Sequence, residues 1–154
     1  MKFLKNHYRK QLIKAAQPST NVALDTNASV TVIHRTEEEL ATVKRYFKRA
    51  QGVRWIKEKR SKEQAVNSSV LYLNDINLRG EPAIALPMMT ENKHFILNLC
   101  NDDVLGWYWY ARKYALRVDL QGTYEDTDFT VPGNHSLEDK LETLVNYLKI
   151  INHE

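Results

Sequence analysis

The sequence predicts a single α+β domain, residues 1–154, in which a mainly antiparallel sheet is packed by two or three helices. A chain of 154 residues, 43 % of them apolar, can bury about two-thirds of its unfolded surface around one core. Two segments place apolar residues at helical spacing behind a capping sequence, and several β-branched runs are separated by turn-forming residues. Neither an internal repeat nor a linker divides the chain.

The first third of the chain predicts a helix, a loop, a strand and a second helix. Residues 3–16 combine an apolar stripe at helical spacing with a basic opposite face, which predicts a basic N-terminal helix. A polar stretch then leads to a strand over residues 30–34. Thr36 and Glu39 form a capping box, and the helix behind it is expected to end at Gly52.

The middle of the chain predicts strands and turns. A short strand from Val53, a charged run over residues 57–63 and a β-rich segment over 66–73 resemble a long-looped hairpin. Residues 83–86, bracketed by two prolines, predict an edge strand, and residues 95–99 predict its neighbour.

The last third predicts a further strand between two helices. Residues 101–115 have both helical and strand features, and we predict a helix there. A strand is expected over residues 116–120 and an acidic loop over 122–133. Ser136 opens an amphipathic C-terminal helix.

Charge is unevenly distributed along the chain. The first 62 residues hold 15 basic and 5 acidic side chains, and the remainder holds 7 basic and 14 acidic ones. The net charges of these parts are therefore +10 and −7, which agree with the total of +3. Such an asymmetry favours a surface that attracts anionic partners, provided that the fold does not interleave the two parts.

Eight cations fall within 18 positions, interrupted by the single acid Glu58. If they converge, they can neutralise phosphates, and Trp55 lies near enough in the sequence to stack on a base. We therefore predict an anion-binding surface whose partner is nucleic acid or an acidic protein surface. Its residues are Arg45, Lys48, Arg49, Arg54, Trp55, Lys57, Lys59, Arg60 and Lys62.

An aromatic run predicts a protein interface. Trp107, Tyr108, Trp109 and Tyr110 present rings to more than one side of either a helix or a strand. One side can join the core while the other meets a second chain, so a homodimer is one expected assembly.

Catalytic signatures are thin. The chain has no phosphate-binding glycine loop, dinucleotide glycine turn, His-Glu-x-x-His helix or nucleophile elbow. His34 and Thr36 resemble half of the paired motif of two-histidine phosphoesterases. Asp75 with Glu91 and Lys93 resembles the carboxylate and lysine set of restriction-type nucleases, which hold a divalent metal. A phosphoesterase or metal-dependent nuclease is thus the alternative function.

These observations together predict a binding protein rather than an enzyme, with no cofactor and no resident metal. The single cysteine, Cys100, suits a reducing compartment, and no apolar stretch approaches the roughly 20 residues that span a bilayer. We expect a cytoplasmic accessory protein without membrane contact. An inhibitor or adaptor carried by a phage or mobile element is one expected context.

Overall fold

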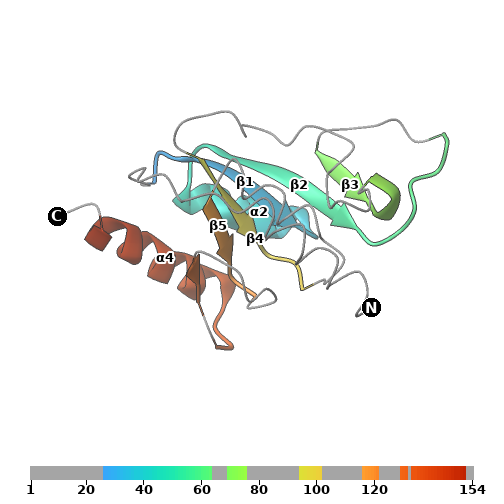
Figure 1. Cartoon of the computed structure of the whole chain (residues 1–154). Coiled ribbons are helices and arrows are strands. Elements are labelled where there is room, and N and C mark those ends of the chain that lie inside the picture. Colours follow the sequence, from blue (N-terminus) through green and yellow to red (C-terminus); the bar gives the residue numbers. More distant parts are fainter. Residues whose placement is uncertain are drawn as a thin grey trace, which may run out of the picture.

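In the computed structural model of the chain, six strands form one sheet in which every neighbouring pair is parallel (Figure 1). The structure describes residues 26–63, 69–75, 94–101, 116–121, 129–131 and 133–151. The strands are β1 (Ser29–His34), β2 (Ala50–Ile56), β3 (Val70–Tyr72), β4 (His94–Asn98), β5 (Leu116–Asp119) and β6 (Phe129–Thr130). Their order across the sheet is β3-β2-β1-β4-β5-β6.

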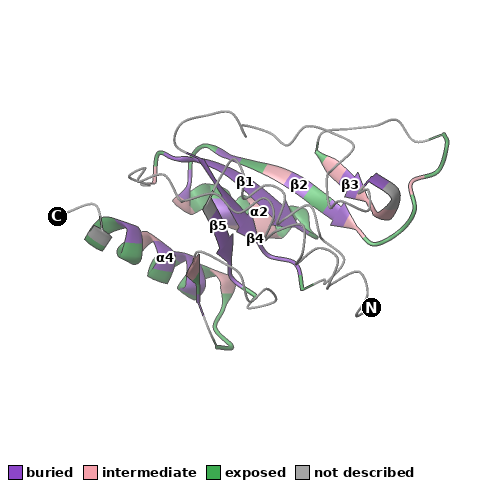
Figure 2. Ribbon diagram, in the orientation of Figure 1, coloured by how far each residue is buried: buried purple, intermediate pink, exposed green. Residues whose placement is uncertain are grey.

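The prediction of a mainly antiparallel sheet is wrong. All six residues of β1 and all five of β4 are buried, as expected for strands of a parallel sheet that are covered on both faces (Figure 2). The expected hairpin is also wrong, because β2 and β3 pair in parallel. Thirteen residues, 57–69, separate these strands, which is enough chain to return to the opposite end of the sheet.

Helix α2 (Glu37–Tyr46) confirms the predicted capping box. Thr36 Oγ1 accepts from the Glu39 amide, and the Glu39 carboxylate accepts from the Thr36 amide. These bonds satisfy amides that the first turn leaves without a helical partner. The expected stop at Gly52 is wrong, because Phe47 caps the helix and Gly52 lies inside β2.

Helix α4 (Leu137–Ile151) begins where Ser136 predicts, and the Asp139 amide donates to Ser136 Oγ. Both described helices pack on one face of the sheet. Val43 and Phe47 of α2 and Leu141 of α4 share a core with Val30 of β1 and residues of β4 and β5. Phe47 and Phe95 meet edge to face, with centroids 5.4 Å apart.

The opposite face of the sheet is also buried but contains more polar groups. Thr31 Oγ1 and His94 Nε2 lie 2.9 Å apart near the amino end of β1 and β4. Arg117 and Asp119 of β5 are fully buried. A short 3-10 helix, η1 (Leu73–Asp75), follows β3 directly.

Several predicted elements lie outside the described residues. They are the helix over 3–16, the edge strand over 83–86, the helix over 101–115 and most of the acidic loop over 122–133; of that loop, β6 is described as a strand. The aromatic interface of Trp107, Tyr108, Trp109 and Tyr110 lies outside them as well.

Among the helices that the structure describes, none combines the length and apolar character needed to cross a bilayer.

Candidate anion-binding edge

The strand order reverses between β1 and β4. From β1 the chain builds outward through β2 and β3, and from β4 it builds outward on the other side through β5 and β6. In open parallel sheets, ligands bind beyond the carboxyl ends of the strands near such a reversal. We call this end of the sheet the carboxyl edge; it is the end toward which the β1 and β2 arrowheads point in Figure 1. The opposite end is the amino edge.

An open hollow of about 280 Å³ lies at the carboxyl edge, beside the ends of β1 and β2. Its lining contains three cations, Arg35 after β1 and Arg54 and Lys57 at the end of β2. Trp55 and Ile56 supply the rest of the lining, although the Trp55 side chain is only 3 % exposed. The hollow is therefore lined by exposed cations and by two other residues of β2.

His34, the last residue of β1, is buried next to this hollow. Its Nδ1 lies 2.8 Å from the Thr36 carbonyl oxygen, and because a carbonyl can only accept, Nδ1 carries the proton and donates. Burial lowers the pKa of His34 below its usual 6.5, while the Thr36 carbonyl, Glu37 and Glu39 oppose the shift and Arg54 adds to it. The imidazole is therefore held neutral at physiological pH.

Gly52 makes room for the His34 ring. A Cβ at position 52 would lie 2.5 Å from His34 Nε2 and 2.6 Å from Leu40 Cδ2. Both distances are too short for any side chain without displacing its neighbours. The close approach of β2 to His34 explains why glycine occupies a strand position here.

The amino terminus of α2 is occupied by its own side chain. The Glu39 carboxylate accepts from the Arg35 amide at 2.9 Å and from the Thr36 amide at 3.0 Å. Helix amino termini commonly bind phosphate through such amides. Because Glu39 already fills these positions, the groups that remain available to an anion at the hollow are side chains rather than the amides of the helix terminus.

A buried polar network lies across the reversal, at the ends of β4 and β5. Asn98 Nδ2 donates to the Cys100 carbonyl at 2.8 Å and to Asp119 Oδ1 at 3.1 Å, and Asn98 Oδ1 accepts from the Cys100 amide. The Gln121 amide also donates to Asp119 Oδ1. Next to this network, Arg35 Nη2 donates to the Asn101 carbonyl at 3.4 Å. Arg35 thus links the ends of β1 and β4.

The connection from β2 to β3 is anchored to η1. Arg60 Nε and Asp75 Oδ1 form an ion pair at 2.9 Å, and Asp75 Oδ2 accepts from the Tyr72 amide at 3.0 Å. The Asp75 side chain is 2 % exposed. Backbone bonds from Leu73 to Glu58 and from Glu58 to Ile56 add to this anchor.

The structure divides the predicted cationic run between the two edges. Arg54 and Lys57 lie at the carboxyl edge, and Lys48 and Arg49 directly precede β2 at the amino edge. A seven-residue strand separates these groups by about 20 Å. Lys59 and Lys62 are exposed on the connection that follows β2.

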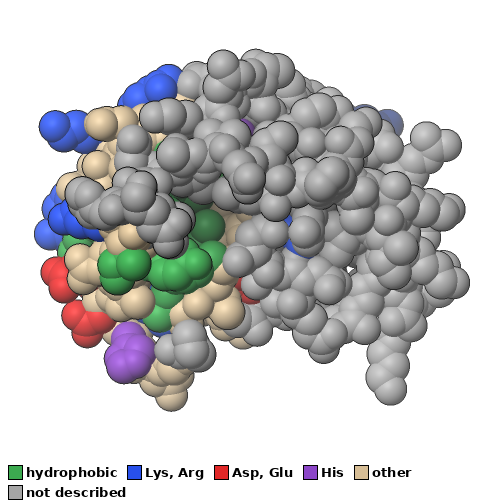
Figure 3. Space-filling model, turned by 60° about the vertical axis from the view of Figure 1, so that its left-hand side comes forward, with side chains coloured by type: hydrophobic (Ala, Val, Ile, Leu, Met, Phe, Trp, Pro, Cys, Tyr) green, Lys and Arg blue, Asp and Glu red, His purple; other side chains and the backbone are tan. Residues whose placement is uncertain are grey.

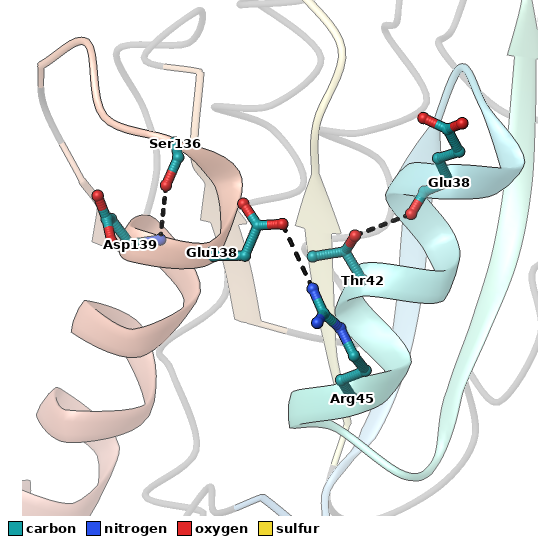
Figure 4. A network of polar contacts seen from close by, with 6 residues as sticks. All are labelled: Glu38, Thr42, Arg45, Ser136, Glu138 and Asp139. Atoms are coloured by element: carbon teal, nitrogen blue, oxygen red, sulfur yellow. Dashed lines mark hydrogen bonds and ion pairs between the residues drawn. The ribbon is translucent and has the colours of Figure 1, made fainter.

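Two members of the predicted run are engaged with acids. Arg60 pairs with Asp75, and Arg45 of α2 points to Glu138 of α4, with Nη2 and Oε1 3.3 Å apart (Figure 4). On the face shown in Figure 3, Lys and Arg side chains lie along the upper and middle left, and acidic side chains lie directly below them. Only part of the run is therefore assembled around one surface.

The residues of the enzymatic alternative have other contacts. Thr36 caps α2, His34 is bonded to the Thr36 carbonyl, and Asp75 is paired with Arg60. Glu91 and Lys93 lie outside the described residues. Within the described ranges, no three His, Cys, Asp or Glu side chains are grouped as metal ligands.

Sequence reasoning missed Arg35 as a site residue. The position of Arg35 in the sequence could have indicated it, because it stands between a strand and a capping box. The carboxyl end of a parallel strand, where the chain continues into a helix, is a common place for ligand-binding residues. Asn98 and Asp119 were missed too. A single polar residue inside an apolar strand, as in residues 95–99, was the available sign.

Comparison of the chain with family models, curated proteins and solved structures found no match.

Proposed function

We propose that the protein binds nucleic acid through the carboxyl-edge hollow. The observation that carries this proposal is the grouping of Arg35, Arg54 and Lys57 around one hollow. Guanidinium groups bind phosphate oxygens through two parallel hydrogen bonds, and an ammonium adds a mobile point charge. The set suits phosphate oxygens approaching from solvent.

A polymer of phosphates fits this surface better than an isolated anion. The cations continue from the hollow onto the β2–β3 connection, where Lys59 and Lys62 are exposed. A row of cations can contact successive phosphates and release counterions along the strand. Because Trp55 is buried, we assign the affinity to phosphate contacts rather than to stacking of bases on its ring.

The test compares the two edges of the sheet. We would measure binding of fluorescent single-stranded DNA and RNA oligonucleotides by anisotropy over a range of salt concentrations. Arg54→Ala/Lys57→Ala should weaken binding and reduce the slope of log affinity against log salt by about 1.4, since each lost contact to a single strand contributes about 0.7. The control Lys44→Ala/Lys48→Ala removes the same charge from exposed positions toward the amino edge and should leave the slope nearly unchanged.

Equal effects of the two double variants would contradict the proposed site, and absence of salt-dependent binding by the wild type would contradict the function. Poly-glutamate is measured in parallel. If it binds through Arg54 and Lys57 while DNA and RNA do not bind, the partner is an acidic protein surface.

A further inference from the structure

We infer that Asp75, an acidic residue, is a positioning residue for the anion site. This inference rests on the proposed function. Asp75 is the last residue of η1, which follows β3, and its side chain is buried. Its two carboxylate oxygens have different partners. Oδ1 pairs with Arg60 of the β2–β3 connection, and Oδ2 accepts from the Tyr72 amide at the end of β3.

The contacts on either side of this pair show what it holds. Residues 57–63 leave the end of β2 directly from the hollow, which Lys57 lines. Arg60 lies at the middle of this stretch, and the Leu73 amide donates to the Glu58 carbonyl at 3.0 Å. The connection is thus fixed to η1 through both a side chain and the backbone.

Fixing the connection confines the lysines that it carries. Lys59 and Lys62 flank Arg60 and are exposed, so their ammonium groups can meet an anion that also contacts Lys57. Ordering the backbone that carries these lysines before binding lowers the entropy lost when the complex forms. Arg60 itself serves as the anchor, because its side chain is only 22 % exposed and its guanidinium is paired with Asp75.

A positioning role for Asp75 and simple electrostatics predict opposite changes in affinity when the charge of Asp75 is removed. Removing a negative charge near a cationic surface should strengthen binding of an anion. If Asp75 orders the connection, however, Asp75→Asn should weaken binding, because the amide loses the charge that holds Arg60. The direction of the change therefore separates a positioning role from a purely electrostatic one.

The experiment compares Asp75→Asn with Glu63→Gln, which removes a negative charge from an exposed position on the same connection. Affinity for a single-stranded oligonucleotide is measured by anisotropy at one salt concentration, on protein whose fold is checked by circular dichroism. Asp75→Asn should bind about tenfold more weakly, and Glu63→Gln as tightly as the wild type or up to about twofold more tightly.

A second pair of variants covers the case in which Asp75→Asn does not fold. Arg60→Gln and Lys62→Gln each remove one positive charge from the connection, and of the two only Arg60 is paired with Asp75. Arg60→Gln should weaken binding more than Lys62→Gln.

Unchanged or tighter binding by folded Asp75→Asn would overturn the inference, as would equal losses from Arg60→Gln and Lys62→Gln. Either result leaves the proposed function standing if Arg54→Ala/Lys57→Ala still weakens binding. A wild type that does not bind nucleic acid overturns the proposed function itself, so the two failures are distinguishable.

Discussion

The two edges of the sheet carry similar numbers of cations in different surroundings. At the amino edge, Lys48 and Arg49 are exposed at the entry to β2. At the carboxyl edge, Arg35, Arg54 and Lys57 line a hollow together with Trp55 and Ile56. The difference shows that cation density in a sequence does not by itself locate a site. What distinguishes the carboxyl edge is that its cations line one hollow.

Buried polar side chains also lie at the carboxyl edge, and each of them is hydrogen-bonded. His34, Asn98 and Asp119 are each almost fully buried at the carboxyl ends of β1, β4 and β5. A buried polar group without a partner costs free energy, whereas one with well-aligned partners holds its neighbours in a single arrangement. Breaking these contacts should therefore lower the free energy of unfolding far more than removing an exposed polar side chain at the amino edge.

The largest expected effect follows from Asn98→Ala. Its amide bonds to both backbone groups of Cys100 and to Asp119. The variant removes these bonds and leaves the Cys100 amide and an Asp119 oxygen with fewer partners, which should lower the free energy of unfolding by about 3 kcal/mol. Urea denaturation followed by circular dichroism measures this change.

The matched control is Gln51→Ala, an exposed amide side chain near the amino end of β2. It should change the free energy of unfolding by no more than about 0.5 kcal/mol. If both alanine variants cost the same, the Asn98 network would stabilise the fold no more than an exposed side chain does, and the claim that this network supports the carboxyl edge would be contradicted.

A pH titration of stability tests His34, with a smaller expected effect. Burial keeps the pKa of His34 below 6.5 in the folded protein, so between that lowered value and about 6.5 the unfolded chain binds more protons. The free energy of unfolding should therefore fall as pH is lowered through this window, with a contribution of at most about 1.4 kcal/mol per pH unit from this residue. Above the window both states are neutral at His34 and the contribution is flat.

The control is His34→Gln, compared with the wild type at each pH. The difference between their unfolding free energies should change below about pH 6.5 and stay constant above it. A constant difference over the whole range would show that His34 takes up its proton equally in both states.

Local patterns in the sequence predicted individual elements better than their assembly. The capping box of Thr36 and the stripe behind Ser136 depend on neighbours three or four residues apart, and both helices are observed. Strand direction depends instead on connections that local patterns do not fix. The charged run over 57–63 satisfied the expectation of a hairpin loop, yet it belongs to a connection between parallel strands. The uninterrupted apolar run of residues 95–97 in β4 was the available sign of a strand that is covered on both faces, as in a parallel sheet.

The candidate site was predictable only in part, for the same reason. Arg54 and Lys57 are close in the sequence to Lys48 and Arg49, but β2 places the two pairs at opposite edges. Arg35 is distant in the sequence from the predicted run and joins it only because β1 and β2 are neighbours in the sheet. Grouping by sequence distance therefore included cations that lie at the amino edge and omitted Arg35, which lines the hollow at the carboxyl edge.

The smallest expected effect concerns the one described ion pair between the two helices, Arg45 with Glu138. The side chains are 64 % and 49 % exposed, so water screens the attraction and each side chain loses rotamer freedom when they meet. A double-mutant cycle with Arg45→Gln and Glu138→Gln isolates the coupling from any effect of Glu138 on the first turn of α4. We expect a coupling of about 0.2–1 kcal/mol that shrinks in high salt. A coupling of several kcal/mol would instead make Arg45 a structural anchor comparable to Arg60, and the contrast between the buried ion pair at the carboxyl edge and the water-screened ion pair between the helices would no longer hold.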